Sequence, residues 1–252
     1  MIDAALRCEG LSRSFGGVRA VAGVSLSLPA GQVTALVGPN GAGKTTVFNL
    51  ITGNLRADAG SAVLRGRSIL GLRPWQVARL GIARSFQDLR LFTHMTVRQN
   101  VLAATERSAW FWQGAGRTAR EQAAEAALQV TGLAALAGAR AVDLAYAERK
   151  FLSMARVLAA GADIWLLDEP ASGLDLASRL RFGQLLRDAR AHGVAICLIE
   201  HSLDVVAELA DRIAFLDQGR VLAEGEPDAI LRDPLLAAIY FGDRPAAEGP
   251  PA

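Results

Sequence analysis

The stretch that most constrains the fold is "VTALVGPNGAGKTTVFNL", residues 33–50. A continuous apolar run leads into a glycine-rich loop, and a segment with helical spacing follows. Turns between secondary structure elements seldom need so many small residues together with one lysine. Glycines allow successive backbone N–H groups to turn inward around an anion, and the positive end of the following helix points at the same anion. The stretch therefore predicts a phosphate-binding loop between a buried strand and a helix.

The loop matches the pattern G-x-x-x-x-G-K-[ST], which binds nucleotide phosphates. In this pattern Lys44 reaches the β- and γ-phosphates, the Thr45 hydroxyl suits Mg²⁺, and Thr46 is a second nearby donor. A glycine-rich turn that merely precedes a helix is the alternative, but the strand, loop and helix in register favour the phosphate site. The residues expected to contact the nucleotide are Gly38, Pro39, Asn40, Gly41, Ala42, Gly43, Lys44, Thr45 and Thr46.

A second group of polar residues follows two later apolar runs. Asp168 and Glu169 end "IWLLDEP", and His201 follows "VAICLIE". Ligands of parallel sheets bind at the carboxyl ends of the strands. We expect Asp168 to act on Mg²⁺ through water, Glu169 to polarise the attacking water and His201 to donate to the γ-phosphate. Gln87, in "ARSFQDLRLF", is a candidate Mg²⁺ ligand that also orients water.

The rest of the chain reads as an α/β fold with a helical insert. Short strands are expected over residues 5–37, and helices over residues 44–52, 74–82 and 96–105. Residues 88–160 are rich in alanine at helical spacing, and strands and helices alternate after them. Residues 244–252, "RPAAEGPPA", have the composition of a flexible tail.

Composition and charge exclude several classes of protein. The chain has 252 residues and a net charge of +2, too mild a balance to indicate nucleic acid binding. No apolar run approaches the length of a membrane span, and the N-terminus does not resemble a signal peptide. We therefore expect a cytoplasmic protein. Cys8 and Cys197 lie far apart and suit no metal spacing; they are expected to be inert thiols.

These motifs, in this order, resemble the ATP-binding cassette (ABC) ATPases. The matching stretches are "GPNGAGKTT", "SFQ", "LLDEP", "ASGLD" and "IEHSLD", spread over about residues 5–243. The resemblance implies a P-loop NTPase core of ABC type with an antiparallel β subdomain and an inserted α-helical subdomain, forming one ATPase domain over residues 1–243. It also implies ATP and Mg²⁺ as cofactors, and places Phe15 where the family's aromatic residue stacks on adenine.

The resemblance is closer to the ATPase subunits of branched-chain amino acid importers. It rests on "FGGVRAVAGVSL", "GIARSFQDLRLFTHMTVRQNV" and "PDAILRDPLLAAIYFGD". It implies a pair of ATPase subunits, identical or not, on the inner face of the cell membrane. Two transmembrane permease subunits and a separate solute-binding protein complete such a transporter. Leu91, Phe92 and Met95 are candidates to receive a helix of the permease, with ordinary packing as the alternative.

One motif departs from the family. The signature commonly reads L-S-G-G-Q and contacts the γ-phosphate bound by the opposite subunit, but here it reads "LAYAE". Losing a hydrogen bond to a charged group costs about 1.5–3 kcal/mol, and alanine adds strain if the family's second glycine has a positive φ. The residues carried over to this contact are Ala145, Tyr146, Ala147 and Glu148.

The departure leaves two alternatives to an active transport ATPase. One is a nucleotide-binding subunit that hydrolyses ATP weakly. The other is an ABC ATPase that serves no transporter, although such proteins usually carry two cassettes or coiled-coil arms. Within the transport hypothesis, urea or a lipid is an alternative substrate.

Overall fold

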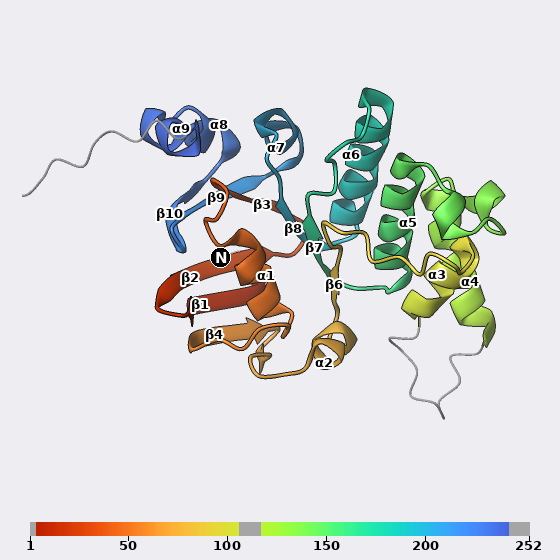
Figure 1. Cartoon of the computed structure of the whole chain (residues 1–252), viewed down its shortest axis with the longest axis horizontal. Helices are drawn as coiled ribbons and strands as arrows, with labels where there is room; N and C mark the ends of the chain where they lie inside the picture. Colours follow the sequence, from red (N-terminus) through yellow and green to blue (C-terminus); the bar gives the residue numbers. More distant parts are fainter. Residues whose placement is uncertain (1–3, 106–116, 242–252) are drawn as a thin grey trace, which may run out of the picture.

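The computed structural model describes residues 4–105 and 117–241, where two β-sheets and several layers of helices enclose two apolar cores (Figure 1). The predicted tail, residues 244–252, lies outside the described residues. The central sheet has the strand order β10-β9-β3-β8-β7-β6. Its strands are β3 (Val33–Val37), β6 (Ile82–Arg84), β7 (Ile164–Asp168), β8 (Ala195–Ile199), β9 (Arg212–Asp217) and β10 (Arg220–Gly225).

The strands from β9 to β6 run parallel, and β10 joins the edge antiparallel. Every residue of β3, β7 and β8 is buried, as expected for a parallel sheet that is covered on both faces. Alternate residues of each strand face different cores: Trp165 and Leu167 belong to one, Ile164 and Leu166 to the other. The three apolar runs recognised in the sequence are therefore the middle of the sheet.

A second, antiparallel sheet covers α1 (Lys44–Ile51) and has the order β2-β1-β4-β5. Its strands are β1 (Ala4–Phe15), β2 (Val18–Pro29), β4 (Ala59–Leu64) and β5 (Arg67–Ser68). The prediction of short strands before residue 33 was wrong, because β1 and β2 each run for 12 residues. Irregular register along the β1–β2 pair interrupts the alternation of apolar residues, so one long strand looks like several short ones in the sequence.

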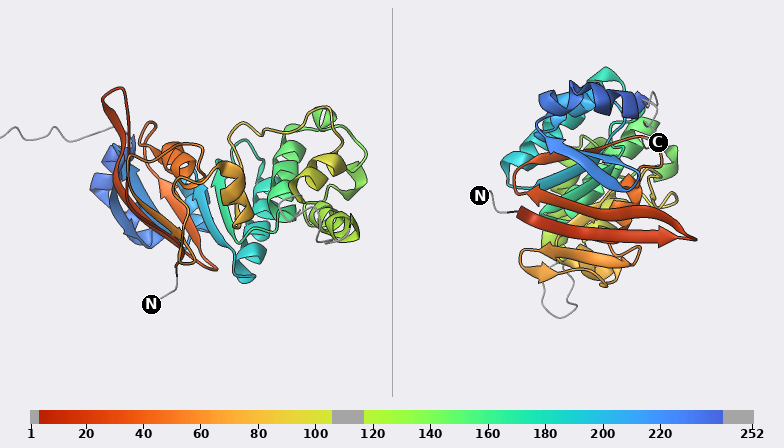
Figure 2. Two further views of the ribbon diagram at one scale, coloured as in Figure 1. Left: turned by 90° about the horizontal axis from the view of Figure 1, so that it is seen from below. Right: turned by 90° about the vertical axis from the view of Figure 1, so that its left-hand side faces the viewer.

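Helices α3 (Val97–Ala104), α4 (Arg117–Val130) and α5 (Tyr146–Ala159) gather at one end of the molecule, opposite the antiparallel sheet (Figure 2). The short turns η2 (Ala134–Leu136) and η3 (Ala141–Asp143) connect α4 to α5. All of these elements fall within the predicted insert. Where that subdomain begins and ends stays a prediction.

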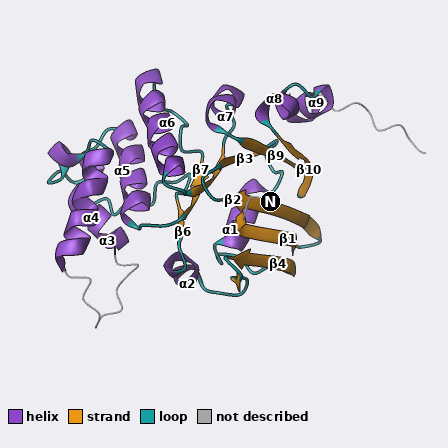
Figure 3. Ribbon diagram, turned by 180° about the vertical axis from the view of Figure 1, so that it is seen from behind, coloured by secondary structure: helices purple, strands orange, loops and turns teal. Residues whose placement is uncertain are grey.

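Of the remaining helices, α2 (Pro74–Arg79) precedes β6, α6 (Leu176–Ala191) follows β7 and α7 (Leu203–Leu209) follows β8 (Figure 3). Helices α8 (Pro227–Leu231) and α9 (Pro234–Phe241) come after β10. The helix predicted over residues 74–82 ends early because Ile82 already pairs with Ile164 in the central sheet. Within the described part of the chain, no helix has the length and apolar character needed to span a membrane.

Candidate active site

The glycine-rich loop connects β3 to α1 in a conformation that side chains would block. Gly38 has φ +152°, and a Cβ there would lie 1.9 Å from the carbonyl oxygen of Leu216. Gly43 has φ +105°, and a Cβ there would lie 2.4 Å from the carbonyl oxygen of Ala20. Both glycines are therefore required by close backbone approaches as well as by their dihedral angles.

The N-terminus of α1 has no side-chain cap, because Gly43 occupies the capping position. Its first backbone N–H groups thus lack intrahelical partners and face the loop. The Lys44 side chain folds over the same loop, where its Nζ donates to the carbonyl oxygens of Gly38 at 2.6 Å and Pro39 at 2.9 Å. Burial lowers the pKa of Lys44, while Glu169 and Asp168 raise it. A cradle of N–H groups beside an ammonium fits a polyphosphate.

Glu169 and His201 meet at the carboxyl ends of β7 and β8. Glu169 has φ +46° and ends the extended chain of β7. Its Oε1 lies 2.9 Å from Nε2 of His201, and its backbone N–H donates to Ile199 at 2.9 Å. The turn at Glu169 therefore frees its carboxylate from the sheet and directs it toward the histidine.

A cavity of about 280 Å³ brings most of the predicted site together. The loop residues 40–46 form one side, and Gln87, Glu169 and His201 form the other. Ala20 and Ile199 complete the lining. Five segments that are far apart in the sequence thus converge on one space at the edge of the central sheet, and Glu169 and His201 reach it from strand ends, as predicted.

Several predicted residues do not line this cavity. Gly38 is not among its lining residues, and Pro39 lines a neighbouring cavity of about 240 Å³ instead. Phe15 is 43% exposed at the end of β1, with the Arg13 guanidinium 5.0 Å from its ring centre. Its exposed ring leaves a face for stacking, and the adenine contact stays a prediction.

Asp168 is buried behind the cavity and is only 3% exposed. Its Oδ2 lies 3.5 Å from Nη2 of Arg84, whose side chain is also buried. Burial raises the pKa of Asp168, and Arg84 opposes that rise. Arg84 further donates to Asn49 on α1 at 2.6 Å and to Thr52, the C-cap of that helix, at 3.3 Å. The Asp168 carboxylate is thus tied to the helix that follows the phosphate loop.

The signature residues lie at the start of α5, away from the cavity. Ala145 caps the helix, and its N–H donates to the Glu148 carboxylate at 2.7 Å. The strain considered for Ala147 is not present, because this residue lies in the first turn of α5 and is not among the residues with positive φ. The Tyr146 hydroxyl donates to the Ser172 carbonyl at 3.3 Å. The segment therefore contacts the loop after Glu169, and its contact with a second nucleotide stays a prediction.

Sequence reasoning missed other residues that support the site. Glu200 is 3% exposed and accepts a hydrogen bond from Ala171 at 2.8 Å. Burial raises the pKa of Glu200. The Tyr240 hydroxyl donates to the carbonyl of His201, which ties α9 to the histidine. Lys150, one of only two lysines in the chain, donates to the carbonyl of Glu169. The scarcity of lysine in the chain was the one sequence feature that could have drawn attention to Lys150.

Comparison with known proteins identifies the family. The family model for ABC transporters matches residues 21–172. The chain belongs to the ABC transporter family. It is an ATP-binding ATPase subunit of this family, whose members dimerise and work with transmembrane permease components.

Two curated relatives cover nearly the whole of this ATPase. The high-affinity branched-chain amino acid transport ATP-binding protein LivG of Salmonella typhimurium is 39% identical over 94% of this chain and 98% of its own length. BraF of Pseudomonas aeruginosa, with the same description, is 37% identical over 94% of this chain and 98% of its own length. In the ADP conformation, an ATP-binding cassette of an ABC transporter superposes with a TM-score of 0.86 at 29% identity, covering 95% of this chain and 99% of that one.

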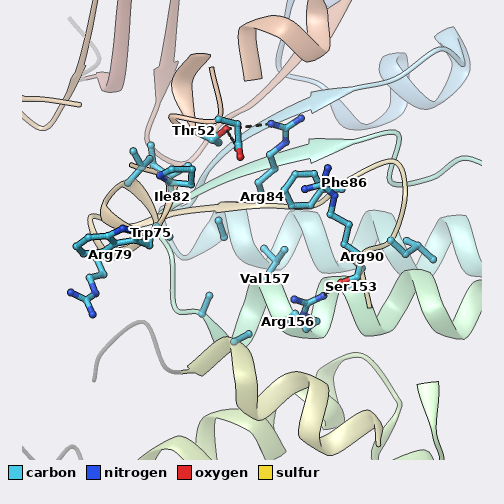
Figure 4. Close-up of a pocket in the computed structure, with 18 residues that line it drawn as sticks. Thr52, Trp75, Arg79, Ile82, Arg84, Phe86, Arg90, Ser153, Arg156 and Val157 are labelled. Atoms are coloured by element: carbon cyan, nitrogen blue, oxygen red, sulfur yellow. Dashed lines mark hydrogen bonds between the residues drawn. The ribbon is translucent and has the colours of Figure 1, made fainter. Parts of the chain in front are cut away.

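A second, larger cavity opens on this ATPase between the central sheet and the inserted helices. We call it the groove; its volume is about 460 Å³. Arg84, Phe86 and Arg90 line one side, and Ser153, Arg156 and Val157 of α5 line the other (Figure 4). The predicted docking residues Leu91, Phe92 and Met95 are not among its lining residues, which instead include their neighbours Leu89 and Arg90.

Proposed function

We propose that this ATPase drives the uptake of branched-chain amino acids across a membrane. The observation that carries the proposal is the cavity in which residues 40–46, Gln87, Glu169 and His201 converge. The substrate class is supported by the relatives LivG and BraF, which match along almost their entire length.

The residues present fit a Mg²⁺–ATP complex. The Thr45 hydroxyl, the Gln87 amide and the Asp168 carboxylate supply the hard oxygen donors that Mg²⁺ prefers, and Thr45 and Gln87 line the same cavity. Asp168 is farther back and acts through water. When bound, Mg²⁺ neutralises the charge that develops on the phosphates during transfer.

Each of the chain's own residues has a separate role in hydrolysis. Lys44 and the N–H groups of the loop hold the phosphates in place. The Glu169 carboxylate accepts a hydrogen bond from the attacking water and polarises it. Nε2 of His201 lies 2.9 Å from the Glu169 carboxylate and holds it in position before ATP binds; with ATP bound, this N–H would donate to the γ-phosphate instead. This arrangement positions the water with little reorganisation at the moment of reaction.

The transporter we propose contains two ATPase subunits, two permease subunits and a separate solute-binding protein. The ATPase would lie on the inner face of the membrane, with a helix of the permease in the groove. The groove is lined by apolar residues such as Val157 and Ala160 together with Arg79, Arg84, Arg90 and Arg156, which suits an amphipathic helix with an acidic residue. Its lining includes Arg84, which also contacts Asp168, so one side chain connects the groove to the site.

Reconstitution with the cognate permease in lipid vesicles tests the proposal. We expect ATP-dependent accumulation of radiolabelled leucine, competed by isoleucine and valine and not by urea. Arg90→Glu reverses a charge at the groove and should abolish stimulation by the permease while retaining ATP binding. Arg187→Glu, on the exposed face of α6, is the control and should retain stimulation. Hydrolysis without transport of any of these amino acids would refute the substrate assignment.

A further inference from the structure

Lys150 stands in a position that the mechanism above does not use. It lies on α5, one turn after Tyr146, and is only 6% exposed. Its Nζ donates to the backbone carbonyl of Glu169 at 2.6 Å. We propose that Lys150 is a positioning residue that holds the Glu169 backbone in the conformation needed for water attack. The inference rests on the proposed role of Glu169 in hydrolysis.

The backbone of Glu169 needs such support. Its φ of +46° lies in the left-handed region, which side chains other than glycine adopt at a cost. Four contacts hold the residue there. Its N–H donates to Ile199 of β8, and its carboxylate meets His201. Its carbonyl accepts from Lys150 of α5 at 2.6 Å and, in a longer turn hydrogen bond of 3.4 Å, from the Ser172 N–H. Of these four contacts, the one from Lys150 alone comes from the inserted helices.

Lys150 acts from behind the site. It is absent from the lining of the nucleotide cavity. Together with Asp168 and Ser85 it lines a separate cavity of about 10 Å³, close to the size of one water molecule. A change at Lys150 should therefore alter the placement of Glu169 without removing a contact to the nucleotide.

The charges around Lys150 explain why a buried cation is tolerated. Burial lowers its pKa, while the carboxylates of Glu200, Glu169 and Asp168 raise it. An ammonium has three donors to satisfy and a guanidinium has five, so lysine fits a small buried site more readily than arginine. The chain uses arginine at nearly every other basic position, and Lys44 is its only other lysine.

The same lysine connects the signature segment to Glu169. Tyr146 and Lys150 are four residues apart and share a face of α5, and Nζ lies 5.7 Å from the centre of the Tyr146 ring. A displacement of the start of α5 would thus reach the Glu169 carbonyl through one side chain. If a second subunit closes on the signature of one chain, the displacement would in this way align Glu169 of the chain that carries that signature.

The first test replaces Lys150 by methionine, which keeps the length and removes the donor. We expect kcat for ATP hydrolysis to fall at least tenfold, because small displacements of a reacting group have large effects on rate. KM for ATP and the Kd of a fluorescent ATP analogue should stay within about twofold. Lys150→Arg, which restores a donor, should recover part of kcat. An unchanged kcat, or a parallel loss of ATP affinity, would overturn the proposal.

Arg181→Met is the matched control. Arg181, on α6, also donates to a backbone carbonyl, that of Thr131, and faces an aromatic ring, that of Phe151 at 4.1 Å. None of these three residues lines the nucleotide cavity. We expect this variant to lose thermal stability and to keep its kcat. An equal fall of kcat in both variants would mean that Lys150 contributes only to general stability.

A cycle with Glu169→Gln separates the two proposals. Glu169→Gln alone should slow hydrolysis about 10²-fold or more and preserve ATP-induced dimers. If Lys150 acts through Glu169, adding Lys150→Met to that variant should lower the residual kcat by less than twofold. If the effects of the two substitutions on kcat multiply instead, Lys150 does not act through Glu169, and the proposed role of Glu169 in hydrolysis still stands. A wild-type rate in Glu169→Gln alone would instead remove Glu169 from the reaction.

Discussion

Arg84→Met removes the cation that faces the buried carboxylate of Asp168, and we expect it to lower the free energy of unfolding by about 3–5 kcal/mol. The closest atoms of the pair lie 3.5 Å apart, and the two side chains are 6% and 3% exposed. At an effective dielectric constant of about 20, two unit charges at this distance attract by roughly 5 kcal/mol. Methionine also loses the hydrogen bonds to Asn49 and Thr52.

Urea titration followed by tryptophan fluorescence measures the loss, with the buried Trp165 of β7 as a reporter. Arg84→Met combined with Asp168→Asn should recover much of the stability, because no uncompensated buried charge remains. The control is Arg232→Met, which breaks a pair whose side chains are 81% and 82% exposed, and it should change stability by less than about 0.5 kcal/mol. A loss below about 1 kcal/mol in Arg84→Met would refute this reasoning.

Three further predictions follow from the same geometry. Lys44→Ala should weaken binding of a fluorescent ATP analogue by about tenfold or more, since a hydrogen bond to a charged group is lost; unchanged affinity would remove Lys44 from the site. Burial raises the pKa of Glu200 above 4.5, so its contribution to stability declines as pH rises through that raised pKa. Glu200→Gln should therefore gain thermal stability over the wild type at pH 8 and little at pH 4. Ala147→Gly should lose about 0.5–1 kcal/mol of stability, seen in urea titration, with no rise in hydrolysis, because Ala147 is already helical.

The sequence identified the groups at the ends of the central strands because strand ends are marked locally. A buried strand shows as an apolar run, and Asp168, Glu169 and His201 follow such runs directly. Parallel pairing of β3, β7 and β8 then places them at one edge. The phosphate loop could also be predicted from the sequence, because the backbone at φ +105° and +152° requires glycine at residues 43 and 38.

Contacts between distant segments could not be read in this way. Arg84 precedes "SFQ" without any feature that marks its partner, which lies 84 residues later. The strain considered for Ala147 depended on a backbone angle that the sequence does not carry. The three residues predicted to receive a permease helix do not line the groove, whereas their neighbours Leu89 and Arg90 do; the docking role of Leu91, Phe92 and Met95 stays a prediction.

The signature segment of one chain does not take part in the nucleotide cavity of that same chain. The cavity is lined by the phosphate loop, Gln87, Glu169 and His201, and none of residues 144–148 is among its lining residues. Tyr146 instead contacts Ser172, so the start of α5 is held against the loop that follows Glu169. A contact between the signature and a nucleotide, which stays a prediction, would therefore be made with the nucleotide of a second subunit.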